Sequence, residues 1–318
     1  MSGLKAIKNR IKSTQSVIKV TKVVNLIATG ELKITKQRYR YVHDFYRSSL
    51  SVFSKVVDRI EGDCDFDNIG DNILSSSVKP IKFILDDYTI DNDVFFAVVI
   101  SSNKGLCGSL NSALHKKLKS DIDQKMKSNP NLKVYIHCVG EKIYDLLKGM
   151  KKFGNYENVS FVSNPEWYSK DIKIATASMV AENIMESAFD KGASDMALYY
   201  NRFINILQQE PSVMYMKDEL NAAKKENKAE ESSSFEIDGN FGDVFFTSAI
   251  NFYTSLFFEV ILSNVVSENA IKMLSMDNAT KSGNKLVEKL ILQRNKIRQS
   301  MITRELLDII GGASATES

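Results

Sequence analysis

The chain has 318 residues, of which 43% are hydrophobic and 25% are charged, so it can bury a sizeable core and has the composition of a soluble protein. Its net charge of +3 is too small to require a nucleic-acid partner, and we expect none. The three cysteines are scattered and form no CxxC motif, which argues against a disulfide framework and a cysteine zinc site. Only four prolines occur, which favours long uninterrupted helices.

Residues 1–60 have the pattern of one long helix. Apolar or small residues recur in steps of three and four from Leu4 to Ile60, an a/d heptad pattern of about eight repeats that predicts a coiled-coil helix. An ordinary amphipathic helix would need only a few such turns. Residues 1–40 hold ten lysines or arginines against one acid, so we expect this end to lie close to an acidic or protein surface. Several d positions are small or hydroxylated, which predicts a slim seam: Thr14, Thr21, Ala28, Thr35 and Ser49.

The middle of the chain alternates between short apolar runs and helical stretches. This alternation predicts a Rossmann-like α/β domain over residues 78–216, with a largely parallel sheet and an edge strand in 203–216. The expected strands are 81–85, 94–100, 133–139 and 196–200, and the expected helices are 112–127, 141–150 and 171–191. The charged segment 217–243 is predicted to be a polar exposed loop or a frayed helix.

The helical period returns over residues 244–312. Only Gly283 interrupts it between about 245 and 310, and the most apolar window, 244–262, contains Asn251 and Glu259, so we expect no membrane span. Two long helices at the two ends of the chain predict a long antiparallel coiled coil that carries the central α/β domain. The residues expected on or near one face are Val260, Ile271, Leu274, Leu286, Leu290, Ile297 and Met301.

The segment ISSNKGLCGSLN, residues 100–111, resembles an active site because two glycines and a cysteine lie between a strand and a helix. Gly105 and Gly108 lack the first glycine of a dinucleotide fingerprint, and no GxxxxGK[ST] motif occurs. A nucleophilic Cys107 would need a base, and His115 has no evident third group to orient it. The aspartates of 86–93 have no metal-ligand spacing. We therefore expect no catalytic residue, no cofactor and no metal.

Segments in the same order along the chain resemble the gamma subunit of F-type ATP synthases, the central-stalk rotor. They are residues 3–22 (GLKAIKNRIKSTQSVIKVTK), the segment 100–111, residues 201–211 (NRFINILQQEP), and residues 267–280 (SENAIKMLSMDNAT) followed by 294–313 (RNKIRQSMITRELLDIIGGA). The resemblance covers nearly the whole chain and is weakest over 62–82 and 217–242.

The resemblance implies a rotor that couples proton-driven rotation of the c-ring to conformational change in the catalytic subunits, with no catalytic group of its own. Its two terminal helices would stand inside the ring of alpha and beta subunits, and its α/β domain would be the foot on the c-ring and bind small central-stalk subunits of the delta or epsilon type. The resemblance also implies partner-binding roles for Lys22, Val24, Arg298, Gln299 and Thr303, the last three as hydrogen-bonding partners of a catalytic-subunit loop.

This sequence departs from the family pattern at three places. Residues 23–31 (VVNLIATGE) replace a Met-rich segment, with Gly30 unfavourable for a helix and Glu31 where a basic residue is usual. These changes alter the coupling contact expected near Val24. Lys104 stands where arginine is usual, which keeps the charge but loses a bidentate fork. The paired-cysteine insertion of chloroplast relatives is missing, so we expect no light-dependent thiol regulation.

Two other functional classes fit the same pattern: a static coiled-coil adaptor with an α/β recognition domain, and a small-molecule enzyme that uses the Gly105 turn. The compartment expected is the matrix side of the mitochondrial inner membrane, as a peripheral subunit, and the alternative is the cytoplasmic face of a bacterial plasma membrane. The Lys-, Asn- and Ile-rich composition favours the mitochondrion. The basic start resembles a targeting peptide, but its heptad order favours retained structure.

Overall fold

A computed structural model describes residues 2–63, 93–151, 158–162, 172–229 and 241–316. The chain forms two compact units. The body is Leu32–Ile271, and the two-helix unit consists of Met1–Glu31 and Lys272–Ser318. The helices are α1 (Ser2–Asp63), α4 (Leu110–Ser128), α5 (Glu141–Lys151), α6 (Ile174–Asp190), α7 (Met216–Ala229) and α8 (Phe241–Thr316). The strands are β1 (Val94–Ile100), β2 (Lys133–Val139), β3 (Val159–Phe161), β4 (Asp195–Phe203) and β5 (Gln209–Tyr215).

The two long helices expected at the ends of the chain are present as α1, of 62 residues, and α8, of 76 residues. Neither helix contains a proline, which would remove a backbone hydrogen bond from the helix interior. α1 continues through Gly30, and a Cβ atom at this position would meet no other atom within 4 Å. A glycine in a helix interior costs only about 1 kcal/mol relative to alanine, which the rest of a long helix readily offsets.

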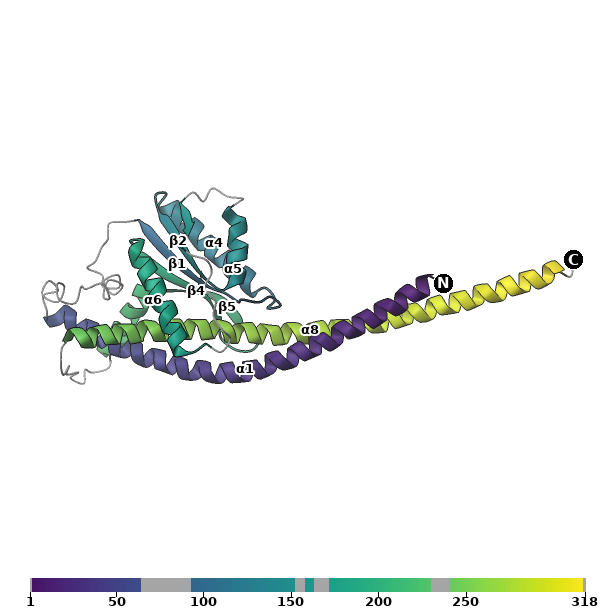
Figure 1. Ribbon diagram of the computed structural model, residues 1–318, viewed down its shortest axis with the longest axis horizontal. Coiled ribbons are helices and arrows are strands. Elements are labelled where there is room, and N and C mark those ends of the chain that lie inside the picture. The colour runs from purple at the N-terminus through teal and green to yellow at the C-terminus, as the bar shows by residue number, and fades with distance from the viewer. Residues whose placement is uncertain (1, 64–92, 152–157, 163–171, 230–240, 317–318) are drawn as a thin grey trace. The chain divides into compact units, whose positions relative to one another are not determined.

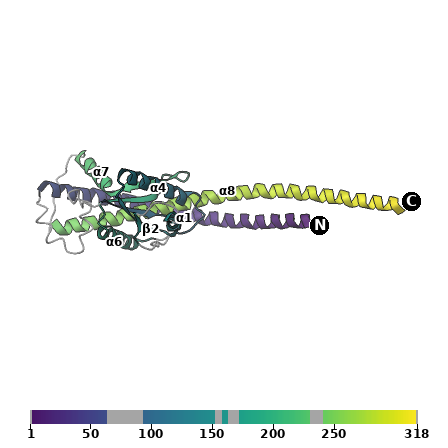
Figure 2. The ribbon, with the colours of Figure 1, turned by 90° about the horizontal axis from the view of Figure 1, so that it is seen from above.

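In the two-helix unit, α1 and α8 pair antiparallel. The hydroxyl oxygens of Thr21 and Thr280 lie 2.8 Å apart, and Nδ2 of Asn25 donates to the carbonyl of Met273 at 3.0 Å. Because the contacting residue numbers rise along α1 while they fall along α8, the two helices run in opposite directions. Both views show them side by side (Figures 1 and 2). The predicted a/d positions of α1 in this unit are all buried or half-buried, so the expected seam is confirmed.

Gly283 has a packing role in this seam. A Cβ atom at this position would lie 2.7 Å from Cγ1 of Ile18, closer than real Cβ contacts allow. The glycine therefore lets α8 approach α1 closely, which is why a residue unfavourable for a helix stands inside a helical pattern. Leu286, which was expected near the same face, is 38% exposed and lies off the seam.

The sheet of the body has the strand order β3-β2-β1-β4-β5. The first four strands are parallel and β5 pairs antiparallel with β4, so the Rossmann-like fold class predicted from the sequence is confirmed. β1 and β2 coincide with their predicted ranges, and β4 extends beyond the expected 196–200. β3 was missed. The strand expected at 81–85 lies outside the described residues.

Both faces of the sheet are covered by helices, and all seven residues of β1 are buried. Phe95, Ala97 and Val99 face the core shared with α4 and α5, while Phe96 and Val98 face the core shared with α6, α1 and α8. Figure 2 shows α4 and α6 on opposite sides of the body. A strand buried on both faces has an almost continuous apolar sequence, which explains why β1 was easy to identify.

Within the body, α8 is buried on every side. From Phe252 to Ala270 all of its residues but one are buried, so a single apolar face, as expected through Val260, describes this stretch wrongly. By length and composition alone α8 is long and apolar enough to cross a membrane. However, 67% of its most apolar window is buried inside the structure, which is typical of the core helix of a folded domain.

The segment 217–243 is not simply an exposed loop. Residues 216–229 form α7, and α8 begins at Phe241. Met216, Leu220 and Ala223 are buried, which is the i, i+4, i+7 spacing of one helix face. The hydroxyl of Tyr46 on α1 donates to Oε2 of Glu219 on α7 at 2.9 Å. Of the two expected alternatives, an exposed loop and a frayed helix, the structure has a helix at 217–229 that packs on the body, and residues 230–240 lie outside the described part.

A buried carboxylate joins α8 to α1. The hydroxyl of Tyr39 donates to Oε1 of Glu259 at 2.9 Å, and Nδ1 of His43 lies 3.5 Å from the same oxygen. Glu259 is 4% exposed, whereas the side chain of His43 is 45% exposed. The nearby carboxylate of Glu259 raises the pKa of His43 above its ordinary value of 6.5, against the opposing effect of burial. This pair therefore makes the contact between the two helices dependent on pH.

Replacing His43 by glutamine should remove a pH-dependent part of the stability. Because the folded-state pKa of His43 is raised, the pair contributes fully below the unfolded pKa, and its contribution is lost as pH rises through the folded pKa. The difference in urea midpoint between wild type and His43→Gln should thus be largest in mild acid and shrink as pH rises.

The matched control is His115→Gln on α4. Burial lowers the pKa of His115, so its effect on stability should have the opposite trend with pH. A His43→Gln difference that stays constant across the pH range would contradict the pairing with Glu259.

Candidate functional site

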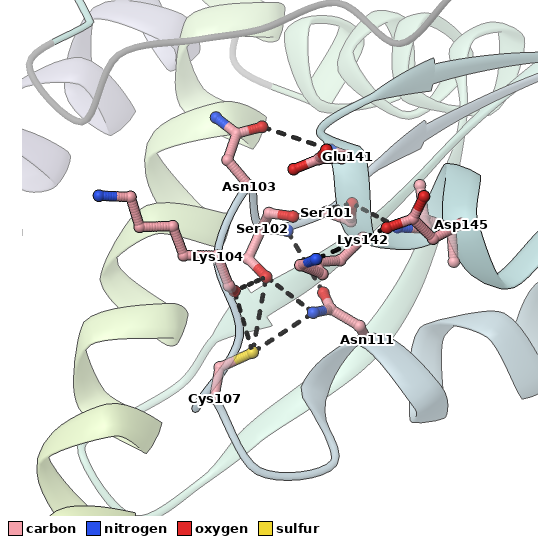
Figure 3. Close-up of polar contacts among 10 residues, drawn as sticks. Ser101, Ser102, Asn103, Lys104, Cys107, Asn111, Glu141, Lys142 and Asp145 are labelled. Atoms are coloured by element: carbon pink, nitrogen blue, oxygen red, sulfur yellow. Dashed lines mark hydrogen bonds and ion pairs between the residues drawn. The ribbon is translucent and has the colours of Figure 1, made fainter.

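The turn between β1 and α4 is the place where the sequence resembles an active site (Figure 3). It is held against the end of β2, where the amide of Ser101 donates to the carbonyl of Val139 at 2.8 Å. Gly140 follows β2 with φ +103°, and a Cβ atom there would collide with the carbonyl oxygen of Ser101. Only glycine allows this approach of the two strand ends.

The thiol of Cys107 belongs to a closed polar network inside this turn (Figure 3). Nδ2 of Asn111 donates to Sγ of Cys107 at 3.3 Å and to Oγ of Ser102 at 2.7 Å. The amide of Ser102 donates to Oδ1 of Asn111 at 3.3 Å, and its hydroxyl donates to the carbonyl of Lys104 at 2.8 Å. These bonds join the strand end, the turn and the first turn of α4. The residues that suggest catalysis therefore hold the turn in shape.

Neither nucleophilic nor metal chemistry fits this arrangement. Cys107 is 3% exposed, and the side chains that contact its sulfur are the hydroxyl of Ser102 and the amide of Asn111, neither of which can accept its proton as a base. Within the described ranges, no group of three or more His, Cys, Asp or Glu side chains could hold a metal ion.

α8 packs against the carboxyl end of β4. Ligands of doubly wound sheets bind beyond the carboxyl ends of the strands at the switch point, here between β1 and β4. At the end of β4, Nδ2 of Asn201 donates to Oδ1 of Asn264 at 2.8 Å, and the amide of Phe203 donates to Oγ of Ser263 at 3.1 Å. The polar groups at the end of β4 are therefore bound by a helix of the same chain.

The partner-binding residues expected from the resemblance lie in the two-helix unit. Lys22 is exposed and Val24 half-buried on α1, and Arg298, Gln299 and Thr303 are exposed on α8. The hydroxyl of Thr303 donates to the backbone carbonyl of Gln299 at 2.9 Å, so these two residues are neighbours on one exposed helix face.

The structure does not bring these residues into one site. Lys22 and Val24 lie beside the part of α8 around Thr280, which contacts Thr21. Arg298 follows Thr280 by about five turns of α8, which places it roughly 27 Å further along the axis. The predicted residues therefore form two separate contact levels on the unit.

Sequence analysis missed a second apolar surface on the two-helix unit. A pair of helices exposed to water would hide its large apolar side chains, yet Leu26 is 72% exposed and Leu292 is 70% exposed. Several of these residues on α1 recur in steps of three and four, a signal that counting from Leu4 alone did not reveal. The exposed set is Val17, Val20, Val23, Leu26 and Ile27 on α1 and Leu292, Ile302, Leu306, Leu307, Ile309 and Ile310 on α8. Exposed apolar residues in such number are typical of a surface that a partner covers.

Comparison with known proteins gives matches over nearly the whole chain. The family model described as "ATP synthase" matches residues 3–316. The ATP synthase gamma chain of Rickettsia canadensis (strain McKiel) is 29% identical, and the alignment covers 99% of this chain and 100% of that protein. The ATP synthase gamma chain of Pelagibacter ubique (strain HTCC1062) is 28% identical with the same coverage.

Solved structures resemble the chain more loosely. A chain of the Euglena gracilis mitochondrial ATP synthase, in a structure of OSCP, F1 and the c-ring, has a TM-score of 0.48 and 17% identity, with 92% of this chain and 94% of that chain covered. A chain of the Tetrahymena thermophila mitochondrial ATP synthase central stalk and c-ring has a TM-score of 0.47 and 19% identity, with 82% and 99% covered.

Replacing Cys107 by serine should cost only about 1 kcal/mol of unfolding free energy, because a hydroxyl can form the hydrogen bonds that Asn111 and Ser102 make to the thiol. The matched control is Cys138→Ser in β2. Cys138 is 1% exposed in an apolar core, and burial raises the pKa of its thiol to about 12. A hydroxyl there should cost about 1–3 kcal/mol. Urea unfolding compares the losses of unfolding free energy in the two variants. A larger loss for Cys107→Ser than for Cys138→Ser would contradict the network.

Proposed function

Because the chain belongs to the ATP synthase family whose model it matches, we propose that it is the gamma subunit of an F-type ATP synthase, the central rotor shaft. The observation that carries this conclusion is that the match includes α1, the α/β domain and α8 together. The rotor is not catalytic, since the catalytic sites lie in the beta subunits. It acts by making different contacts with three equivalent catalytic subunits, and such contacts shift a conformational equilibrium between states of different nucleotide affinity.

The exposed apolar residues of the two-helix unit support this role. We infer that the ring of alpha and beta subunits covers them, because removing apolar surface from water is favourable wherever a neighbour is available. The seam itself is slim, with Gly283 and Thr280 facing α1, so the pair fits a narrow passage. The basic start of α1 suits contact with acidic residues of the ring of alpha and beta subunits.

The two contact levels on the unit would meet the ring at different heights. The first level, near Thr280, consists of Lys22 and Val24. The second level, further along α8, consists of Arg298, Gln299 and Thr303. We propose that the latter hydrogen-bond a loop of one catalytic subunit at a time. A hydrogen bond contributes only about 0.5–1.5 kcal/mol net, which suits a contact that must break at each step of rotation.

The body would be the foot that rests on the c-ring and binds the small central-stalk subunits of the delta or epsilon type. The thiol of Cys107 is buried and hydrogen-bonded to Ser102 and Asn111, which supports a mechanical role over the enzyme alternative. The static adaptor is not favoured, because the relatives that match over the full chain are gamma chains of a rotary enzyme.

For the compartment, we propose the matrix side of the mitochondrial inner membrane, with the chain as a peripheral subunit of a membrane-associated, proton-translocating complex. The Lys-, Asn- and Ile-rich composition supports it. The matching gamma chains named above are bacterial, which fits the alternative, the cytoplasmic face of a plasma membrane. Imaging of a C-terminally tagged chain together with a mitochondrial marker decides between the two.

The rotor assignment is tested by affinity purification of the tagged chain and mass spectrometry of its partners. Alpha, beta and c subunits should co-purify in fixed proportion, and the isolated chain should not hydrolyse ATP. Recovery without a hexameric ATPase would favour the adaptor, and turnover by the isolated chain would favour the enzyme.

The double substitution Gln299→Ala with Thr303→Ala should lower coupled ATP synthesis in inverted membrane vesicles. Both side chains are exposed, and alanine is a good helix former, so the helix should be retained. Losing one or two hydrogen bonds of about 1 kcal/mol each predicts a loss of several-fold to tens-fold. The exposed pair Asn278→Ala with Lys281→Ala on α8 is the control. Unchanged synthesis by a normally assembled double variant would exclude Gln299 and Thr303 as coupling residues.

A further inference from the structure

The apolar core of the body contains a concentrated group of buried polar side chains on α8. Ser263, Asn264 and Ser267 are completely buried, and the neighbouring residues Val260, Leu262 and Val265 of the same helix belong to the apolar core of the body. Burying such groups costs free energy unless each is hydrogen-bonded, and an apolar helix of the same shape would be at least as stable. Their presence suggests a requirement other than stability.

All three contact the carboxyl end of β4. Nδ2 of Asn201 donates to Oδ1 of Asn264 at 2.8 Å, while the carbonyl of Asn201 accepts from the hydroxyls of Ser263 at 3.3 Å and Ser267 at 3.1 Å. The amide of Phe203 donates to Oγ of Ser263 at 3.1 Å. The contact uses both the backbone and the side chain of the strand end, so it is defined in direction as well as in position. We call these five residues the β4–α8 joint.

A second directional contact holds the same stretch of α8 from its α1 side. Oε1 of Glu259 accepts from the hydroxyl of Tyr39 at 2.9 Å, one turn before Ser263. α8 is thus hydrogen-bonded to the sheet and to α1 within about three turns. Apolar burial is non-directional and tolerates small rotations, whereas a buried hydrogen-bond network has one register.

We propose that the β4–α8 joint bears the torque between the α/β domain and the shaft helix of the rotor. This inference rests on the proposed function. The joint lies at the surface of α8, about 5 Å from the helix axis, so its bonds oppose rotation of the helix against the sheet. If α8 slipped by one residue position, a rotation of about 100° around its axis, the side-chain amide and the backbone carbonyl of Asn201 would be left buried and unpaired. The apolar residues around α8 provide cohesion, and the joint provides the register.

The test uses the complete ATP synthase in inverted vesicles, with the double substitution Asn201→Leu and Asn264→Leu. Leucine has nearly the shape of asparagine, and replacing both partners of a buried hydrogen bond by apolar groups is nearly neutral for stability. ATP hydrolysis and assembly should therefore be retained. Protons pumped per ATP hydrolysed should equal the wild-type ratio at low proton gradient and fall several-fold as the opposing gradient builds, because the joint slips only under load.

The single variant Asn264→Leu leaves the amide of Asn201 unpaired and should assemble poorly, which separates a loss of folding from a loss of register. Asn251→Leu, an exposed asparagine on the same helix, is the matched control and should pump as the wild type does. A second variant, Ser267→Ala, removes one hydroxyl with a good helix former, while the carbonyl of Asn201 keeps the bond from Ser263, so it should assemble and slip under load to a smaller extent. It decides the question if the double leucine variant does not assemble.

If either assembled variant pumped the wild-type number of protons per ATP hydrolysed at every gradient, the proposal that the joint bears torque would be overturned. A fall of hydrolysis and pumping in equal proportion at all gradients would show a merely structural role and would also overturn it. Failure of the wild-type chain itself to assemble with alpha, beta and c subunits, or to pump, would contradict the proposed function, so the two failures are distinguishable.

Discussion

The structure depends on one constraint: α8 must be the core helix of the body and one half of a two-helix seam. Inside the body nearly every residue from Phe252 to Ala270 is buried, and the sheet, α6 and α1 supply the covering surface. That burial explains two features at once. It accounts for the membrane-like hydropathy of α8, and it places polar groups of α8 against β4 and α1.

The carboxyl ends of β1 and β4 show how fold and function are separated in this protein. A sheet of order 3-2-1-4-5 is commonly associated with nucleotide binding, but function resides in the site and not in the fold. Here the end of β4 binds a helix of the same chain, and the glycine- and cysteine-containing turn after β1 is closed by Ser102 and Asn111. The domain keeps the scaffold and uses its ligand-binding edge to hold the shaft helix.

What the sequence allowed us to predict follows from how local each signal is. β1 and β2 were placed correctly because strands buried on both faces are short continuous apolar runs, and the seam of α1 because it repeats over many turns. β3 has three residues and little pattern, and the packed face of α7 was not predicted because Met216, Leu220 and Ala223 stand among charged residues. The joint could not be predicted, because Asn201 and Asn264 meet only after the sheet has formed and α8 has packed on it.

The chemistry of α8 changes along its length in the way that a rotor requires. In the body its contacts are dense and include directional bonds, so a load can be passed without slipping. In the two-helix unit its seam with α1 uses small residues, and its outer face exposes apolar side chains such as Leu292 together with polar ones such as Gln299. Contacts made through such a face are weak one by one, so they can be exchanged among equivalent partners. Under the proposed function, one helix combines the β4–α8 joint, which should not slip, with a surface whose contacts break at each step.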